Sequence, residues 1–285
     1  MMHEAAKRPI RAIALRALLA AACLSGFASC VPIPGAASFS REIKSRNVVY
    51  SPQDWPAPMM GDVYRPETAG TLPGVLLIHG NGKVGDDGRW QMDGIARKLS
   101  ERGYVVFNIT YRMAPDWEYP APLLDVKEAL KWMREHAEEN GMDTERIGAF
   151  GYSAGGYVAL LAAMPGDSGI KAVVAGAAPS DLTYYGMGDL IRNFLGGSPE
   201  EVPGLYHEAS PVNHVTRRSP PVFLYHGERD KLVNPGHTRE MLVELEKHKV
   251  PHETRWMPGK GHVAAFLMSG DVVDEAIGFL DRYLK

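Results

Sequence analysis

Cysteine is nearly absent from this chain. Its 285 residues include two cysteines, Cys23 and Cys30, and both lie within the first thirty residues. The body that follows therefore has no cysteine left for a disulfide, even in a compartment where disulfides form. It also lacks the cysteine cluster of a structural zinc site. Its ordinary globular composition is enough to bury a full hydrophobic core in one or two domains.

Motifs for metals, nucleotides and nucleic acids are missing as well. The chain has no H-E-x-x-H sequence and no Walker A sequence. A formal G-x-G-x-x-G occurs at residues 80–85, but the next expected strand, Tyr104–Ile109, does not end in the acidic residue that a dinucleotide fold needs. The net charge is −3, and the body after residue 30 has no basic run to attract nucleic acid. We therefore expect no metal, no cofactor and no nucleic-acid partner.

The first thirty residues have the pattern of a bacterial export signal. A basic start precedes an apolar stretch at residues 17–28, which is too short for a comfortable transmembrane helix. The run Phe27-Ala28-Ser29-Cys30 resembles a lipoprotein signal, in which the cysteine is lipidated, and Cys23 is an alternative nearer the basic start. We expect residues 1–30 to be a lipoprotein signal, with plain secretion and a retained anchor as alternatives. The expected location is periplasmic, or at the membrane through Cys30.

Buried strands and amphipathic helices alternate along the body. Continuous apolar runs, typical of strands buried on both faces of a parallel sheet, occur at Val75–Ile78, Tyr104–Ile109, Ile147–Phe150, Ile170–Ala178 and Val222–Tyr225. Apolar residues at helical spacing occur at residues 123–133, at residues 241–245 after the expected N-cap Asn234 and Pro235, and at residues 272–280. This alternation predicts an α/β fold with a mostly parallel central sheet and helices on both faces.

A single domain accounts for this pattern. We expect residues 31–45, which begin rich in proline, alanine and serine, to be a linker and residues 46–285 to form the domain. The long stretch Asp181–Ser219 holds a possible short helix at Asp189–Leu195. We therefore expect the domain to have either a small cap, formed by this stretch, or no cap.

The clearest motif is Gly151-Tyr152-Ser153-Ala154-Gly155-Gly156. This G-x-S-x-G sequence follows an apolar run and opens an alanine-rich helical stretch. A strand, a sharp turn and a helix are the setting of a nucleophilic serine. Glycines at positions 151 and 155 are needed because the strand and the helix approach closely there. Ser153 is therefore the candidate nucleophile.

Two further groups follow later apolar runs. Asp230 follows Val222–Tyr225, and His262 follows residues 253–257. Serine, aspartate and histidine in this order are typical of an α/β-hydrolase triad. We expect His262 to be the general base and Asp230 to orient it. The rival acid is Asp181, and the rival histidine, His226, is expected to have a structural role.

Attack of such a serine on a carbonyl gives a tetrahedral intermediate, whose oxyanion needs backbone N–H donors. One donor is expected from Ala154, which follows the nucleophile. The second is expected from Asn81, with Gly82 as the alternative, because the sequence His79-Gly80-Asn81-Gly82 stands where many esterases have H-G-G-G. We expect His79 to brace this loop.

The motifs together resemble the α/β-hydrolase superfamily, and in particular the bacterial esterases grouped with BD-FAE and the hormone-sensitive-lipase-like enzymes. Beyond the residues above, the resemblance rests on Tyr111-Arg112-Met113-Ala114-Pro115, Asp125-Val126, Ser210-Pro211-Val212 and His226-Gly227-Glu228-Arg229-Asp230. It implies the α/β-hydrolase fold and hydrolysis of carboxylic esters through an acyl-enzyme without a cofactor. Asn81 departs from the glycine pattern of that family.

The expected function is therefore a serine carboxylesterase that acts on small or carbohydrate-linked esters. A serine peptidase of the prolyl-oligopeptidase type and a non-catalytic binding protein on a hydrolase scaffold are the alternatives. The sequence does not indicate the acyl group, the alcohol or the oligomeric state.

Overall fold

The computed structural model describes residues 43–68, 70–80, 87–183 and 188–285. Contacts divide the chain into residues 1–38 and residues 39–285, and the second unit holds all of the described residues. The predicted signal at residues 1–30 therefore lies outside the described residues, as does most of the predicted linker. Within the described ranges, each helix is too short or too polar to cross a membrane.

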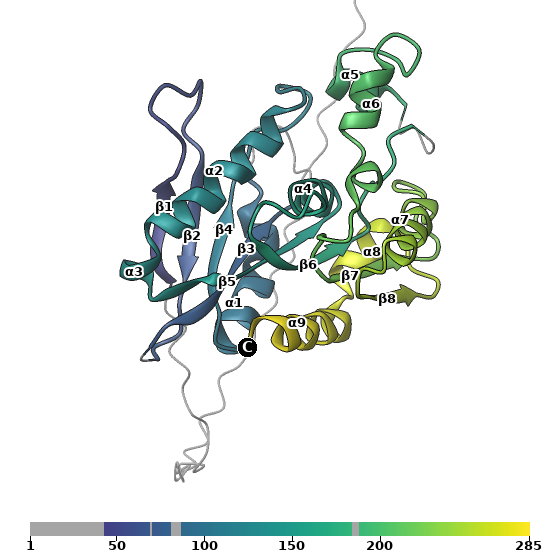
Figure 1. Ribbon diagram of the computed structural model, residues 1–285. Coiled ribbons are helices and arrows are strands. Elements are labelled where there is room, and N and C mark those ends of the chain that lie inside the picture. The colour runs from purple at the N-terminus through teal and green to yellow at the C-terminus, as the bar shows by residue number, and fades with distance from the viewer. Residues whose placement is uncertain (1–42, 69, 81–86, 184–187) are drawn as a thin grey trace, which may run out of the picture. The chain divides into compact units, whose positions relative to one another are not determined.

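A single sheet forms the centre of the second unit (Figure 1). In the described part of the chain its strands are β1 (Ile43–Val49), β2 (Met60–Tyr64), β3 (Leu72–Ile78), β4 (Val105–Ile109), β5 (Met142–Tyr152), β6 (Ile170–Gly176), β7 (Val222–Gly227) and β8 (His252–Met257). Their order across the sheet is β1-β2-β4-β3-β5-β6-β7-β8. Pairing is parallel from β4 to β8 and antiparallel at β1–β2 and β2–β4. The predicted α/β fold with a mostly parallel sheet is confirmed.

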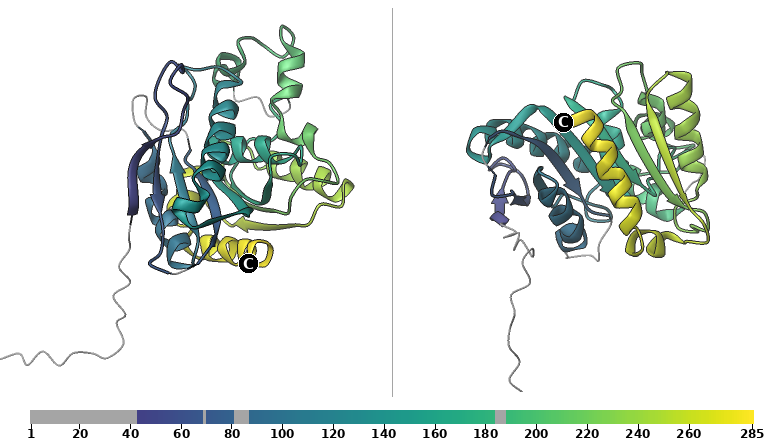
Figure 2. Two further views of the ribbon diagram at one scale, coloured as in Figure 1. Left: turned by 60° about the vertical axis from the view of Figure 1, so that its left-hand side comes forward. Right: turned by 90° about the horizontal axis from the view of Figure 1, so that it is seen from below.

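Helices cover both faces of this sheet (Figures 1 and 2). The longer ones are α1 (Asp93–Glu101), α2 (Ala121–Glu135), α4 (Ala154–Ala163), α7 (Gly236–Lys247) and α9 (Gly270–Leu284). The short ones are η1 (Arg89–Met92), α3 (Ala137–Asn140), α5 (Asp189–Leu195), α6 (Pro203–Glu208), η2 (Pro211–His214) and α8 (His262–Leu267). Helix α7 begins at Gly236, one residue later than predicted, because Pro235 takes the N-cap position and the Asn234 side chain accepts the Gly236 N–H.

The alternation of side chains along β3 explains why both faces need cover. Leu76 and Ile78 lie in the apolar core under α2 and α4, whereas Val75 and Leu77 lie in a second core under α1 and α9. All four side chains are fully buried. Since successive residues of a strand point to opposite faces, a continuous apolar run requires an apolar layer on each side. The view from below in Figure 2 shows α9 crossing one of these faces.

The segment between β6 and β7, predicted to form a small cap or none, carries short helices. Helix α5 has the bounds that the sequence predicted, and its residues Ile191, Phe194 and Leu195 are buried. Helices α5 and α6 are joined to β7 through η2. Only this short helical segment, within the described residues, stands between β6 and β7 as a cap.

The antiparallel edge was not predicted. Strands β1 and β2 have few continuous apolar residues, and β2 contains the buried Asp62. A pattern search for apolar runs therefore misses them. Their side chains take part in a polar network with the segment that precedes α1.

Candidate active site

The turn after β5 exposes Ser153 between strand and helix. Ser153 has φ 54° and ψ −121°, a conformation that L-residues rarely adopt. Its N–H donates to the Gly176 carbonyl at 2.7 Å, and its carbonyl accepts the Tyr157 N–H at 2.9 Å. The turn is thus fixed to β6 on one side and to α4 on the other.

The glycines that flank Ser153 have no room for a side chain. A Cβ on Gly155 would lie 2.2 Å from the Ile78 carbonyl oxygen and 2.3 Å from that of His79. A Cβ on Gly151 would lie 2.3 Å from the Gly155 carbonyl oxygen. These contacts are with backbone atoms, which cannot swing aside, so the close approach predicted for this turn is confirmed.

The structure brings Ser153, His262 and Asp230 together in a hydrogen-bonded series. His262 Nε2 is 2.9 Å from Ser153 Oγ, and His262 Nδ1 is 2.6 Å from Asp230 Oδ2. A carboxylate only accepts, so Nδ1 carries the proton and Nε2 is free to accept the serine proton. The side chain of Asp230 is fully buried, and 12% of the His262 side chain is exposed. This geometry suits transfer of a proton from Ser153 to His262.

Asp230 is held by several donors besides His262. Its Oδ1 accepts the N–H groups of Leu232 and Val233, each at 2.9 Å, and His226 Nε2 lies 3.3 Å from its Oδ2. Burial raises the pKa of Asp230, but the hydrogen bonds from His226, His262 and Val233 outweigh that effect and hold the pKa well below its ordinary value. Asp230 therefore stays charged at neutral pH.

His226 supports the carboxylate from within the protein. Its ring is fully buried, with Nε2 3.0 Å from the Val233 carbonyl oxygen and Nδ1 2.7 Å from Thr238 Oγ1. Since a carbonyl only accepts, Nε2 carries the proton and can also point it at Asp230. The sequence identified His226 as structural, and it missed that the histidine contacts the acid of the series.

Tyr152, the residue before Ser153, was not singled out by the sequence. Its hydroxyl donates to the His262 carbonyl at 2.6 Å, and the two rings lie 5.2 Å apart. Burial, together with the negative charge of Asp230, raises the pKa of Tyr152, so the hydroxyl remains a donor. The variable position of G-x-S-x-G therefore fixes the backbone that carries the histidine.

Asp181, the rival acid, makes other contacts. Its Oδ1 accepts the N–H and the hydroxyl of Thr183, at 2.9 and 2.5 Å, and its own N–H points to His237 Nδ1 at 3.3 Å. The carboxylate closes its own turn after β6, while His262 pairs with Asp230.

On the opposite side of Ser153 lies the end of β3. A Cβ on Gly80 would lie 3.3 Å from Ser153 Cβ, so the backbone of Gly80 passes beside the nucleophile. Ala154 is the first residue of α4, and the N–H of a first helical residue has no partner within its helix. The two other predicted oxyanion residues, Asn81 and Gly82, lie outside the described residues.

His79 stabilises the backbone on this side of the site. The ring is buried, its Nδ1 lies 2.6 Å from the Gly80 carbonyl oxygen, and its own carbonyl accepts the Tyr111 hydroxyl at 2.8 Å. The buried histidine is therefore tied both to the following residue and to the strand end of β4.

A cavity of about 290 Å³ opens beside Ser153. Its described lining is almost entirely apolar. It comes from the segments after β4 and β6, from the first turns of α2 and α4, from α5 and from the loop after β7: Tyr111, Met113, Ala114, Pro122, Ser153, Ala154, Tyr157, Val158, Pro179, Leu182, Leu190, Ile191, Phe194 and Leu232. The short helix α5 thus forms one wall. A small apolar group attached to a reacting carbonyl fits such a space.

Trp55 and Trp117 are not among the described residues that line this cavity. The Arg112 guanidinium packs on the ring of Trp55 at 4.1 Å and near that of Trp117 at 5.4 Å, and it pairs with the buried Asp125 at 2.7 Å. This arrangement holds the chain that leads from β4 into α2.

Comparison with known proteins agrees with this geometry. The BD-FAE family matches residues 61–245. The chain is 29% identical over 258 residues to the esterase LipC of Mycobacterium tuberculosis, covering 81% of this chain and 62% of that protein. It is 30% identical over 235 residues to the probable carboxylic ester hydrolase LipM of the same organism, covering 74% of this chain and 54% of LipM. The chain thus spans less than two thirds of the length of these relatives.

Solved structures share the fold. A truncated carbohydrate esterase from the gut microbiota superimposes with a TM-score of 0.77 at 20% identity, covering 87% of this chain and 98% of that one. At this identity the likeness establishes the α/β-hydrolase fold and leaves the substrate open.

Proposed function

The chain belongs to the BD-FAE family of α/β-hydrolases, and we propose that it is a serine carboxylesterase acting on small or carbohydrate-linked esters. The observation that carries this proposal is the series Ser153–His262–Asp230, with hydrogen-bonding distances of 2.9 and 2.6 Å. A serine at a strained strand–helix turn, a histidine ready to accept its proton and a buried charged acid are what acyl transfer requires.

In the proposed reaction, Ser153 Oγ attacks the ester carbonyl carbon while its proton moves to His262 Nε2. The carbonyl oxygen becomes an oxyanion, which takes hydrogen bonds from the Ala154 N–H and from a donor in the loop after Gly80. The intermediate collapses, the alcohol leaves with the proton from His262, and an acyl-enzyme remains. Water then attacks the acyl-enzyme with His262 as base, which releases the acid and restores Ser153.

The apolar cavity supports a small acyl or alcohol group. A volume of about 290 Å³ lies just below the range for small-molecule sites, roughly 300–1,000 Å³. A cavity of this size, closed on one side by α5, suits short acyl chains better than long ones. The proposal also includes esters in which the alcohol is a carbohydrate.

A panel of p-nitrophenyl esters, from acetate to laurate, and acetylated sugars tests the proposal. Fluorophosphonate labelling accompanies it, with one adduct expected on Ser153 that is lost in Ser153→Ala. We expect turnover to be greatest with short acyl chains. Labelling without turnover of any ester would contradict the esterase, and an unlabelled folded protein would favour a binding protein on a hydrolase scaffold.

Aminoacyl-p-nitroanilides separate the esterase from the peptidase alternative. Both activities use the same nucleophile and base, so labelling alone cannot distinguish them. Cleavage of the anilides with no cleavage of the esters would replace the proposal by a serine peptidase. We expect the opposite preference.

We further propose that the protein is exported and attached to a membrane through a lipidated Cys30. The support lies in the sequence, where a basic start and an apolar stretch precede Phe27-Ala28-Ser29-Cys30. Mass spectrometry of the mature N-terminus tests this. A diacylated Cys30 is expected, whereas an unprocessed Met1 would refute export.

A further inference from the structure

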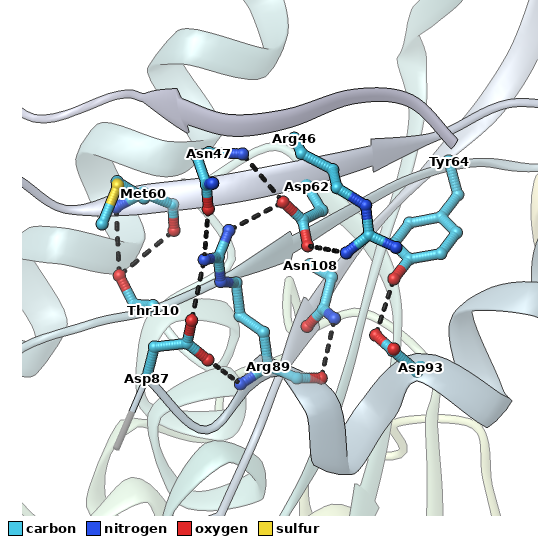
Figure 3. Close-up of polar contacts among 10 residues, drawn as sticks. All are labelled: Arg46, Asn47, Met60, Asp62, Tyr64, Asp87, Arg89, Asp93, Asn108 and Thr110. Carbon is cyan, nitrogen blue, oxygen red and sulfur yellow. Dashed lines mark hydrogen bonds and ion pairs between the residues drawn. The ribbon is translucent and has the colours of Figure 1, made fainter. Parts of the chain in front are cut away.

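A buried ion pair joins the antiparallel edge of the sheet to η1, the short helix before α1. Arg89, the first residue of η1, is 5% exposed, and its Nη1 lies 2.8 Å from Asp62 Oδ1 on β2. Its Nη2 donates to Asn47 Oδ1 at 2.7 Å and to Asp87 Oδ2 at 2.8 Å. Asn108 on β4 donates to the Arg89 carbonyl at 3.0 Å. These five residues, Asn47, Asp62, Asp87, Arg89 and Asn108, are here named the Arg89 cluster (Figure 3).

Stability alone is a weak reason for such a cluster. Burying a charged pair costs desolvation energy, and apolar side chains of similar volume are often as stabilising. Within the described residues, Arg89 Nε and Asn108 Oδ1 have no hydrogen-bond partner although both atoms are buried. A network that leaves buried polar atoms unpaired is not arranged for maximal stability.

The cluster does fix the place of Gly88. Gly88 has φ 69°, and a Cβ there would lie 2.3 Å from His79 Cε1, so the backbone of Gly88 rests on the imidazole ring. Arg89 is held through its side chain and through its backbone. Its N–H donates to Asp87 Oδ1, and its carbonyl accepts a hydrogen bond from the Asn108 side chain. Gly88 therefore cannot leave the His79 ring while Arg89 remains bound.

His79 passes this restraint to the nucleophile. Its Nδ1 holds the Gly80 carbonyl oxygen at 2.6 Å, and Gly80 passes beside Ser153 Cβ. A continuous series of contacts thus runs from Asp62 through Arg89, Gly88 and His79 to Gly80. Each contact is between described residues, and each is buried or nearly so.

We propose that Arg89, anchored by Asp62, is a positioning residue for the oxyanion side of the active site. It acts by holding Gly88 against His79, which fixes the backbone of Gly80, the residue directly before the expected oxyanion donor Asn81. The inference rests on the proposed esterase function. Oxyanion stabilisation depends steeply on donor position, since a displacement of about 1 Å can cost about 10²-fold in rate.

The test compares Arg89→Met with Arg46→Met. Arg46 reaches the other oxygen of Asp62 at 3.8 Å, but its side chain is 58% exposed, so its removal leaves the cluster intact. We expect Arg89→Met to lower kcat for p-nitrophenyl butyrate by about 10- to 100-fold with KM nearly unchanged. Arg46→Met should stay within twofold of the wild type. Arg89→Lys keeps the charge but lacks the planar fork of donors that the guanidinium offers, and it should fall between them.

A double variant separates positioning from folding. Asp62→Leu combined with Arg89→Met removes both charges, so no unpaired ion remains buried. Urea unfolding and active-site titration give the fraction of folded, competent enzyme. If Arg89 positions the site, kcat per competent site stays low in the double variant. If kcat returns with stability, or if folded Arg89→Met matches the wild type, the inference is wrong.

The rate at which a fluorophosphonate labels Ser153 tests the role of Arg89 independently of ester turnover. Attack of Ser153 on a fluorophosphonate places negative charge on a phosphoryl oxygen at the same position. The labelling rate constant should fall by a similar factor in Arg89→Met and not in Arg46→Met, whichever esters are turned over. Equal labelling rates would overturn the inference, while absence of ester turnover in the wild type would overturn only the proposed function.

Discussion

The two sides of the active site are built in different ways. On one side, Ser153, Asp230 and His262 follow the ends of β5, β7 and β8, three parallel strands of one sheet. On the other side, Gly80 is set by contacts that reach Asp62 and Asn47 on the antiparallel edge. The first side depends on local motifs at strand ends, and the second on residues distant in sequence. Substitutions on the first side should remove a group that takes part in the reaction. Substitutions on the second side should displace the backbone that carries the oxyanion donor.

The largest effect is expected for Ser153→Ala. This change removes the nucleophile but no buried group, so it should lower kcat by roughly 10⁶-fold, as knockouts of comparable triads do, without loss of stability. Ester turnover and urea unfolding measure the two quantities. A variant that retained even one hundredth of the activity would place the nucleophile elsewhere.

Asp230→Asn should come next, with a loss of about 10⁴-fold in kcat, because an amide favours the wrong tautomer of His262. Asp181→Asn is the matched control, since Asp181 contacts Thr183 and not His262. The control should stay within a few fold of the wild type. A larger loss in the control than in Asp230→Asn would reverse the assignment of the acid.

Gly155→Ala should mainly affect stability. The new Cβ would meet two backbone carbonyl oxygens at 2.2 and 2.3 Å, so we expect the free energy of unfolding to fall by about 3 kcal/mol or more. Gly94→Ala in α1 is the control, because a Cβ there meets nothing within 4 Å. It should be neutral or gain up to about 1 kcal/mol from helix propensity. Similar stabilities of the two variants would show that the turn can relax.

His226→Met tests how the acid is held. Loss of its donor to Asp230 should lower kcat by about tenfold and the free energy of unfolding by about 1–3 kcal/mol. The side-chain amide of His226→Gln can still donate to Asp230, so this variant should retain most of the kcat and most of the stability.

The pH dependence of this effect has a definite sign. The folded-state pKa of Asp230 is lowered, so its charge contributes stability above the unfolded pKa of about 3.9, and this contribution is lost as the pH falls through the folded-state pKa. The stability difference between His226→Met and the wild type should therefore be largest near pH 7 and shrink below about pH 4. Urea unfolding at both pH values measures it. A difference that grew in acid would contradict this account.

The smallest effect is expected at the cavity wall. Leu190 lines the cavity and is 39% exposed, so Leu190→Ala removes a partial apolar contact. We expect kcat/KM for p-nitrophenyl butyrate to fall by about threefold, consistent with partial loss of apolar burial, and that for the acetate to stay unchanged. Equal changes for both esters would mean that α5 does not contact the acyl group.

The parts predicted from sequence are those in which local pattern dictates structure. Continuous apolar runs located the inner parallel strands, and helix Asp189–Leu195 was placed with its observed bounds. The edge strands β1 and β2 were missed because an edge strand beside a polar network has no apolar run. The start of α7 was wrong by one residue because Pro235 takes the N-cap.

What the sequence determined is therefore the fold class, the glycine-lined turn around Ser153 and the order in which serine, aspartate and histidine follow their strands. These features depend on side-chain periodicity and on residues a few positions apart. The tertiary structure decided between Asp230 and Asp181 as the partner of His262. It also decided that Tyr152 and His226 hold His262 and Asp230, and that Arg89 reaches Asp62, 27 residues away. Such pairings depend on which strand ends and loops meet in space, and a single sequence does not encode that in any local pattern.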